Sequence, residues 1–325
     1  MKAILQDKPG GKLYLKDIPI PEPGKGEVLV KMSFSPLNPS DLSFLQGSYA
    51  GSPDYPVVPG LEGSGTVVRS GKGIIARSRE GKRVACTVTA HNTGTWAEYM
   101  VTSAYRTIIL DKNIDDEQGS MLLVNPLTAV SFIEIARKHK HAAMVNNAAA
   151  SSLGKMLLEL CRKNDIKLIN IVAREAQYDT LKKLGAENVL ISSSQGFENE
   201  LARLSEKLGA RLFFDAVGGE QAEIMLRTSP PGSTIIIYAK LSESNISIEP
   251  RLLLQEDKTI SGFYLGNYIA GKSILRNLRL IGKAKGLLSG DFNIQVSAKF
   301  PLEKIDEALD HYRENMSAGK VLLYP

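Results

Sequence analysis

The sequence predicts an α/β protein in which a doubly wound parallel sheet is inserted into a β-rich domain. Short strands separated by Gly/Pro turns fill residues 1 to about 110. Apolar strands then alternate with amphipathic segments to about residue 260, a pattern typical of βαβ units. Mixed structure follows, so we expect one domain over residues 1–120 plus 262–325 and a second over 121–261. The length of 325 residues suits two domains of about 150 residues each.

Strands of the first domain are predicted where apolar and polar residues alternate after a turn. They cover residues 13–18, 27–32, 66–68 and 83–88. The pattern changes at residues 115–117, where three consecutive acids mark the start of a helix. The chain ends in a predicted strand, residues 320–324, that returns to the first domain.

The middle of the chain alternates between predicted strands and predicted helices. The strands cover residues 142–146, 167–172, 189–191, 212–215 and 234–238, and the helices cover 155–163, 176–184, 197–208 and 221–226. A long helix over 274–288 follows. Parallel sheets of this kind bind ligands at the carboxyl ends of their strands, so we expect a site there.

The composition argues against several classes of protein. Two cysteines, Cys86 and Cys161, and four histidines leave little material for a disulfide framework, a cysteine-rich zinc lobe or metal-dependent catalysis. No segment approaches the ~20 apolar residues of a membrane helix, and the N-terminus lacks a signal-peptide core. We therefore expect a cytoplasmic protein with no membrane partner. A net charge of +5 favours phosphate-bearing ligands slightly. The basic run 137–141 is interpreted as a solvated loop, so we expect no nucleic-acid partner.

Two glycine-rich segments match phosphate-binding patterns, but neither follows the first strand of the middle domain, where such a loop is expected. Residues 71–76 (GKGIIA) fit GxGxxG/A, but the residues after them do not predict a helix with an apolar face, so we interpret them as a turn. Residues 266–273, from Gly266 to Ser273, match the P-loop pattern, which leaves a nucleotide hydrolase as an alternative function. Few residues follow Ser273, and none of them forms an apolar strand ending in an acid for Mg²⁺. A coincidental match at a strand–helix junction is therefore favoured.

A third segment, residues 146–154 (NNAAASSLG), directly follows the first strand of the middle domain and opens a helix. Small residues at this turn let the backbone approach a pyrophosphate. The spacing of a dinucleotide-binding loop is kept, although Ser151 stands where the middle glycine is usual. We predict cofactor contacts from Asn147, Ala148, Ser151, Ser152, Leu153 and Gly154.

The end of the second strand of the middle domain bears on the choice of cofactor. An NAD site usually offers an acid to the ribose 2′-hydroxyl at this place. Here Val172 and Ala173 are apolar and Arg174 follows, which favours a 2′-phosphate and hence NADPH. Glu175 lies beside it, and the alternative for Arg174 is an exposed residue at the start of a helix.

Several segments together resemble the medium-chain dehydrogenase/reductase superfamily, in its zinc-free branch of quinone oxidoreductases and 2-enoyl thioester reductases. Their order and spacing carry the resemblance over nearly the whole chain. The segments are NPSD (38–41), QGSY (46–49), PGLEGSG (59–65), GKRV (81–84), GTWAEY (94–99), NPLTA (125–129), LKKLGAE (181–187), DAVGG (215–219) and GFYL (262–265). The resemblance implies a GroES-like catalytic domain with a Rossmann-type NADP-binding domain inserted in it.

Two departures from that family are informative. Relatives that use zinc place a cysteine near Asn38 and a histidine near Leu61, and this chain has neither ligand. Glu62 alone cannot hold a catalytic zinc. The resemblance therefore implies a metal-free reaction, in which a nicotinamide reduces a quinone or an electron-poor C=C bond.

The resemblance also implies roles for individual residues. Tyr49 would donate a proton and, together with Asn38, form the catalytic pair; Trp96 and Tyr264 would line the substrate pocket. Thr128, Tyr238, Phe263 and Leu265 would contact the cofactor. Arg276 and Arg279 could hold the phosphate of a phosphopantetheine arm, although a solvated helix face is favoured for both. Ser40 and Asp41 are interpreted as a helix N-cap.

The predicted function is a zinc-independent, NADPH-dependent reductase of quinones, enones or 2-enoyl thioesters. A second possibility is a non-catalytic NADPH sensor or an RNA-binding protein of the same fold, besides the nucleotide hydrolase. Relatives of this family are commonly homodimers, so we expect a homodimer acting on a small molecule. The natural electron acceptor is left open.

Overall fold

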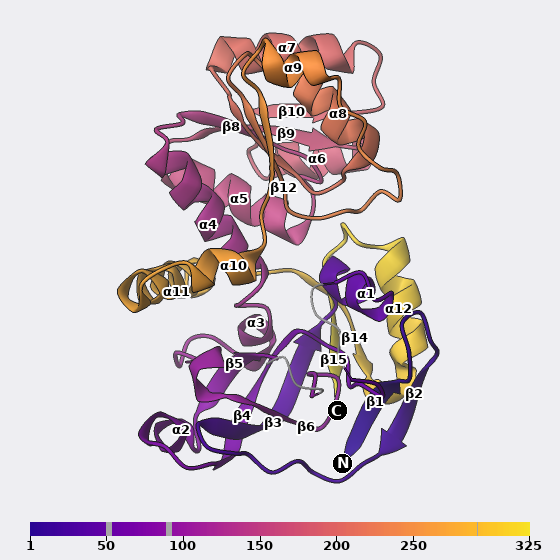
Figure 1. Cartoon of the computed structure of the whole chain (residues 1–325), viewed down its shortest axis with the longest axis vertical. Helices are drawn as coiled ribbons and strands as arrows, with labels where there is room; N and C mark the ends of the chain where they lie inside the picture. Colours follow the sequence, from indigo (N-terminus) through magenta and orange to yellow (C-terminus); the bar gives the residue numbers. More distant parts are fainter. Residues whose placement is uncertain (50–53, 89–92, 291) are drawn as a thin grey trace. The chain divides into compact units, whose positions relative to one another are not determined.

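A computed structural model describes residues 1–49, 54–88, 93–290 and 292–325 and divides into two compact units (Figure 1). Unit 1 comprises Met1–Val124 and Ala284–Pro325, and unit 2 comprises Asn125–Lys283. The predicted second boundary, after residue 261, lies earlier than the observed one. Strand β13 (Thr259–Gly262) pairs in parallel with β12 (Thr234–Ile237) and completes the sheet of unit 2, and Tyr268 and Arg276 after it bond to Glu134 of the same unit.

Unit 1 is built on a mixed sheet with the strand order β14-β15-β3-β4-β5-β7, and β6 also pairs with β3. Its strands are β3 (Glu27–Pro36), β4 (Glu62–Ser70), β5 (Arg83–Thr87), β6 (Tyr99–Ser103), β7 (Thr107–Ile109), β14 (Val296–Pro301) and β15 (Lys320–Tyr324). A separate hairpin joins β1 (Lys2–Gln6) and β2 (Leu13–Asp17). The C-terminal strand β15 pairs with β3, so the end of the chain rejoins the N-terminal part as predicted.

Short helices cover this sheet: α1 (Pro39–Leu45), α2 (Ile74–Arg79), α3 (Asp116–Ser120) and α12 (Ile305–Glu314). Asp115 caps α3, because its side chain accepts a hydrogen bond from the Gln118 N–H. Helix α2 was not predicted, since residues 71–76 were interpreted as a turn. It forms because Ala76 packs into the core of unit 1. The strand before it, β4, runs antiparallel to β3 and β5, so this segment lacks the parallel strand–turn–helix context of a dinucleotide loop.

Unit 2 contains a parallel sheet with the order β10-β9-β8-β11-β12-β13. Its remaining strands are β8 (Ala143–Asn146), β9 (Lys167–Val172), β10 (Asn188–Ile191) and β11 (Leu212–Asp215). Its helices are α4 (Asn125–Lys138), α5 (Ser152–Lys163), α6 (Glu175–Lys183), α7 (Phe197–Leu208), α8 (Gly219–Thr228), α9 (Pro250–Leu254) and α10 (Leu265–Ala270). Helix α11 (Ile274–Leu288) begins in unit 2 and ends in unit 1.

Helices cover both faces of the parallel sheet. Phe213 and Phe214 are consecutive in β11, yet they lie in different core clusters because side chains alternate along a strand. Phe213 packs with residues of α7 and α8, whereas Phe214 packs with residues of α4 and α5. The predicted doubly wound α/β architecture is confirmed.

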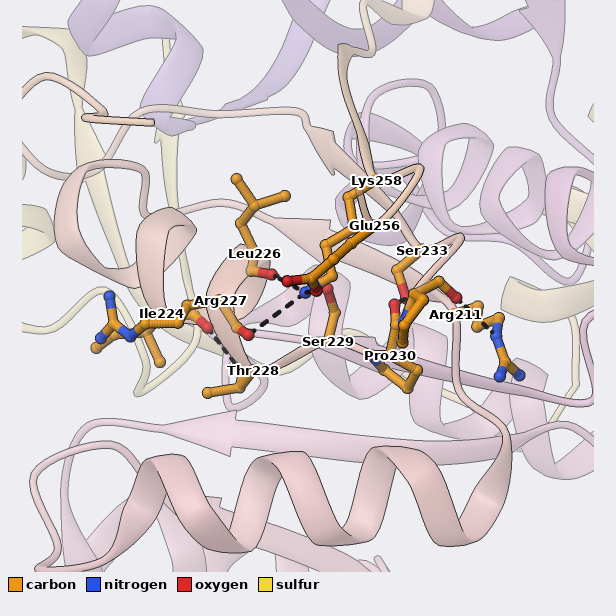
Figure 2. Close-up of polar contacts among 11 residues, drawn as sticks. Arg211, Ile224, Leu226, Arg227, Thr228, Ser229, Pro230, Ser233, Glu256 and Lys258 are labelled. Atoms are coloured by element: carbon orange, nitrogen blue, oxygen red, sulfur yellow. Dashed lines mark hydrogen bonds and ion pairs between the residues drawn. The ribbon is translucent and has the colours of Figure 1, made fainter. Parts of the chain in front are cut away.

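A buried lysine, Lys258, lies at the amino end of β13 beside the C-terminal end of α8 (Figure 2). The side chain of Lys258 is 1% exposed, and its ammonium donates to the carbonyl oxygens of Leu226 (2.9 Å) and Arg227 (3.4 Å) at the end of α8. It also pairs with the Glu256 carboxylate at 2.9 Å. A cation at this position satisfies helix-terminal carbonyls that have no partner within the helix.

Candidate functional site

The first βα turn of unit 2 has the local geometry of a cofactor loop. Strand β8 ends at Asn146, and α5 begins at Ser152 after Ser151, whose Oγ accepts a hydrogen bond from the Gly154 N–H at 3.1 Å. Ala148 adopts a left-handed φ of 47°. A Cβ added to Gly154 would lie 2.2 Å from the Ala149 carbonyl oxygen, so only glycine permits this close contact between helix and turn.

The start of α5 retains polar groups that a pyrophosphate could use. In the part of the chain that the structure describes, the backbone N–H groups of Ser152 and Leu153 donate to no acceptor. Asn146 is 0% exposed, and both polar atoms of its amide lack a protein partner. Uncommitted N–H groups at a helix N-terminus attract anions, so the residues of this loop fit the diphosphate of a dinucleotide.

Asn147 ties the turn to the neighbouring strand. Its side-chain Nδ2 donates to Asp215, and its Oδ1 accepts from the Ala216 N–H at 2.7 Å. The Asp215 carboxylate also accepts from the N–H groups of Val217 and Gly218. Both side chains are buried, so within unit 2 Asn147 fixes the adjacent ends of β8 and β11. Asp215 was part of a recognised motif, but its role as the acceptor for Asn147 was missed.

Arg174 lies just beyond the end of β9, the neighbour of β8 in the sheet. It is the N-cap residue of α6, and its side chain is exposed. Ala173 separates it from β9, and the Ala173 N–H donates to Gln177 within the same turn at 3.0 Å. The structure therefore places a cation at the edge where the ribose of a dinucleotide is expected.

Two predicted cofactor residues, Tyr238 just after β12 and Phe263 just after β13, meet in an aromatic cluster within unit 2. Phe132 of α4 stacks on Phe214 with ring centroids 3.9 Å apart. The rings of Tyr238 and Phe263 lie edge-on to the Phe132 ring, with centroid distances of 5.1 and 5.0 Å. Burial and the nearby Asp215 carboxylate raise the pKa of Tyr238, so its phenol stays protonated. Thr128 lies in the first turn of α4 and is 5% exposed. Tyr264 is 41% exposed, and Leu265 follows it as the first residue of α10.

Residues 266–273 do not form a phosphate-binding loop. Helix α10 occupies most of the segment, and the Lys272 ammonium lies 3.6 Å from the Glu134 carboxylate. Arg276 also bonds to Glu134, with its Nε 2.7 Å from Oε1, so it is not an uncommitted phosphate ligand, although its side chain is 43% exposed, in keeping with the solvated helix face that was favoured. Arg279 is exposed. The P-loop match therefore has no structural support, because a P-loop requires an open turn of backbone N–H groups.

Unit 1 contains a buried charge cluster formed by Asn38, Asp41, Glu62 and Lys320. Asn38 Nδ2 donates to Glu62 at 2.9 Å, and the Lys320 ammonium donates to Asn38 Oδ1. Asp41 accepts from the N–H groups of Asn38 (2.8 Å) and Leu61 (3.0 Å). All four residues of the cluster are at most 3% exposed. Burial raises the pKa of Asp41 to about 7, an effect that its two backbone donors only partly offset.

The Glu62 carboxylate also accepts from the N–H groups of Leu123 (3.2 Å) and Val124 (2.9 Å), the last residues of unit 1 before α4. Burial raises the pKa of Glu62 and lowers that of Lys320. This donor set does not fit a zinc ion, because an ammonium occupies the polar side of Asn38 and no Cys or His contributes. Among the residues that the structure describes, no group of three or more His, Cys, Asp or Glu side chains could hold a metal ion.

Two predicted site residues are buried in unit 1. Asn38 is 1% exposed and is the N-cap of α1, and Asp41, which was interpreted with Ser40 as part of the N-cap, is the N3 residue whose carboxylate accepts from the Asn38 N–H. Trp96 is 0% exposed and packs with Ile4 and Leu37 in the core of unit 1. Tyr49 is half-buried and precedes residues 50–53, which lie outside the described part of the chain.

Comparison with known proteins agrees with this geometry. The family model for the alcohol dehydrogenase GroES-like domain matches residues 24–112, and that for the zinc-binding dehydrogenase matches residues 152–279. A mitochondrial enoyl-[acyl-carrier-protein] reductase of Caenorhabditis elegans is 30% identical over 262 residues, which cover 78% of this chain and 74% of the relative.

Solved structures of other proteins are also similar to this chain. A Mesorhizobium loti protein assigned as an NADPH:quinone reductase is 32% identical with a TM-score of 0.94, covering 100% of this chain and 98% of the other. A mycobacterial protein solved in complex with NADPH shares the fold at 22% identity, with a TM-score of 0.85 and full coverage of both chains. The two family models together match more than half of the chain, and the two relatives at 30% and 32% identity cover 78% and 100% of it. The chain therefore belongs to the medium-chain dehydrogenase/reductase superfamily, in the branch of quinone oxidoreductases and 2-enoyl thioester reductases.

Proposed function

We propose that this oxidoreductase uses NADPH to reduce quinones or activated C=C bonds without a metal ion. The observation that carries the proposal is the start of α5, where small residues and the uncommitted N–H groups of Ser152 and Leu153 form an anion-binding turn at the first strand. Gly154 permits the close packing that this turn needs.

Arg174 supports NADPH over NADH. A guanidinium beyond the second strand pairs well with a 2′-phosphate, whereas a 2′-hydroxyl gains little from it. The relatives point the same way, since one is assigned as an NADPH:quinone reductase and another binds NADPH. Replacing Arg174 with Gln should lower the ratio of kcat/KM for NADPH to that for NADH at least tenfold, because one charge-assisted contact is lost. Arg203, an exposed arginine on α7, provides the control R203Q.

The bound nicotinamide would supply the hydride, and the protein must stabilise the charge that develops on the acceptor oxygen. On the family resemblance we assign proton donation to Tyr49, and an ordinary phenol is protonated at pH 7 and can donate. The catalytic role predicted for Asn38 is not carried into this proposal, since both polar ends of its amide are bonded to Glu62 and Lys320. Y49F should lower kcat at least tenfold, whereas Y105F, at an exposed tyrosine of unit 1, should not change it.

The acceptor class needs a direct assay. NADPH oxidation is measured with a quinone, an enone and a crotonyl thioester, each with and without a chelator. Turnover of at least one acceptor that is insensitive to the chelator supports a metal-free reductase. NADPH binding without turnover of any acceptor would instead favour the non-catalytic sensor, and no NADPH binding would refute the proposal.

We also propose a homodimer and a cytoplasmic location. The family resemblance supports the dimer, which light scattering coupled to size exclusion tests. In the described part of the chain, no helix is both long and apolar enough to cross a bilayer. Several curated relatives are mitochondrial, so cell fractionation is the test of location.

A further inference from the structure

Glu134 of α4 joins three residues from the segment that matched the P-loop pattern and the helix after it. Its Oε2 accepts from the Tyr268 hydroxyl at 2.7 Å, and its Oε1 accepts from Arg276 Nε at 2.7 Å. The Lys272 ammonium lies 3.6 Å from Oε2. We call these four residues the Glu134 cluster. It fixes α10 and the start of α11 to α4, and all of its members belong to unit 2.

The Glu134 cluster is better shielded from water than an ordinary surface ion pair. The side chains of Glu134 and Lys272 are 18% and 12% exposed. The Lys272 ammonium lies 3.8 Å from the centre of the Tyr268 ring, which adds a cation–π contact. Burial alone would raise the pKa of Glu134, but the hydrogen bonds from Tyr268 and Arg276 lower it, so the carboxylate is charged at neutral pH.

Tyr268 connects this cluster to the residues that follow β13. Its ring lies 5.2 Å from the Phe263 ring, which in turn lies 5.0 Å from Phe132 on α4. The Phe263 N–H donates to the Ile237 carbonyl at the end of β12. A Cβ on Gly266 would lie 2.8 Å from the Tyr264 ring, so this glycine makes room for that ring. Phe263 is thereby held by β12 through its N–H and by Phe132 and Tyr268 through its ring, which fixes residues 263–265 at the carboxyl ends of the strands.

We infer that Glu134 is a positioning residue for the nicotinamide half of the proposed cofactor site. The turn at residues 263–265 follows β13, on the side of the sheet beyond β8 and β11, whereas Arg174 follows β9 on the opposite side of β8. A dinucleotide crosses such a sheet where the strand order reverses, so its two halves lie over these two sides. Glu134 then positions the residues beside the nicotinamide and has no effect on recognition of the 2′-phosphate. This inference rests on the proposed function.

The test compares Glu134→Gln and Tyr268→Phe with the control Glu159→Gln. Glu159, on α5, has a side chain of equal exposure (18%) that pairs with Arg162 and Lys163 and has no contact with residues 263–273 among the described interactions. We expect E134Q and Y268F to lower kcat about tenfold, because small displacements of reacting groups are costly. The preference for NADPH over NADH should stay within twofold, and backbone amides of residues 263–273 should exchange hydrogen faster. E159Q should match the wild type in all three measurements.

Each outcome has a distinct meaning. An active wild type whose kcat and amide exchange are unchanged in both E134Q and Y268F would overturn the inference and leave the proposed function intact. A change in the NADPH preference equal to the loss of kcat would also overturn it, since a general structural defect affects both halves. A wild type with no turnover of any acceptor would refute the proposed function and the inference together.

Discussion

Replacing Asp41 with Asn should change how the stability of unit 1 depends on pH. Asp41 is 1% exposed, and its two carboxylate oxygens accept from the N–H groups of Asn38 and Leu61. Glu62 is close enough to raise its pKa further, whereas Lys320 lowers it. The substitution keeps the size of the side chain and removes its charge, so it isolates the effect of ionising this one group.

The magnitude follows from the pKa of the folded chain. Raising the pKa of Asp41 from 3.8 to about 7 makes ionisation cost about 4 kcal/mol more in the folded chain than in the unfolded chain. The folded state binds more protons than the unfolded state between these values, so stability is fully present below pH ~4 and falls as the pH rises through ~7. Between pH 5 and pH 8 the loss is about 3 kcal/mol. D41N has no such loss, but the substitution itself removes one acceptor, at about 1 kcal/mol at any pH.

The assay is urea denaturation at pH 5 and pH 8, followed by tryptophan fluorescence. Trp96 is the single tryptophan, and it lies in the core of unit 1, so its emission reports the unfolding of that unit. Because the wild type has already lost about 1 kcal/mol by pH 5, D41N should be about as stable as the wild type at pH 5 and about 3 kcal/mol more stable at pH 8. Asp310→Asn, at a side chain that is 70% exposed, should parallel the wild type. A stability difference between D41N and the wild type that is the same at both pH values would refute the reasoning.

Three further predictions concern unit 2. Lys258→Met should destabilise it by about 3 kcal/mol in urea denaturation followed by far-UV circular dichroism, because the carbonyls at the end of α8 and the Glu256 carboxylate lose their buried partner. Lys163→Met, on the surface of α5, should cost less than about 1 kcal/mol. Gly154→Ala should abolish NADPH binding measured by cofactor fluorescence, since its Cβ would lie 2.2 Å from a backbone oxygen; binding at wild-type affinity would contradict the assigned loop. Gly282→Ala, where an added Cβ meets nothing within 4 Å in α11, should leave NADPH binding unchanged and raise stability by up to about 1 kcal/mol in the same denaturation assay.

The parallel sheet of unit 2 could be predicted from the sequence because its signals are local. The predicted strand at 212–215 and the predicted helices at 197–208 and 274–288 have the observed bounds, since each has a clear apolar period and an adjacent turn residue. Helix α2 could not be predicted, because six residues with an exposed Ile74 show no apolar face. The contact units divide after Lys283, later than the expected boundary after residue 261, because Tyr268 and Arg276 bond to Glu134 of α4, contacts that are distant along the chain.

The candidate site divides in the same way. Ser151 and Gly154 were identified because the loop that contains them is continuous in sequence. The partners of Asn38 were not, because Lys320 lies 282 residues away and nothing local distinguishes it from other lysines. The same holds for Glu134 and Tyr268, which are 134 residues apart.

Burial explains why a polar side chain that only stabilises the fold can be mistaken for a functional one. Asn38 was given a catalytic role by the family resemblance, and its neighbours in the sequence did not show which groups bond to its amide. Inside a folded unit, however, an unpaired polar group costs free energy, so distant chain segments supply donors and acceptors for it. Asn38 has Glu62 and Lys320, and Glu134 has Tyr268 and Arg276. An isolated polar residue in a sequence therefore predicts a partner more securely than a reaction. The groups that remain available for ligands include the N–H groups of Ser152 and Leu153. These groups belong to the backbone, so the residue types in the sequence do not reveal them.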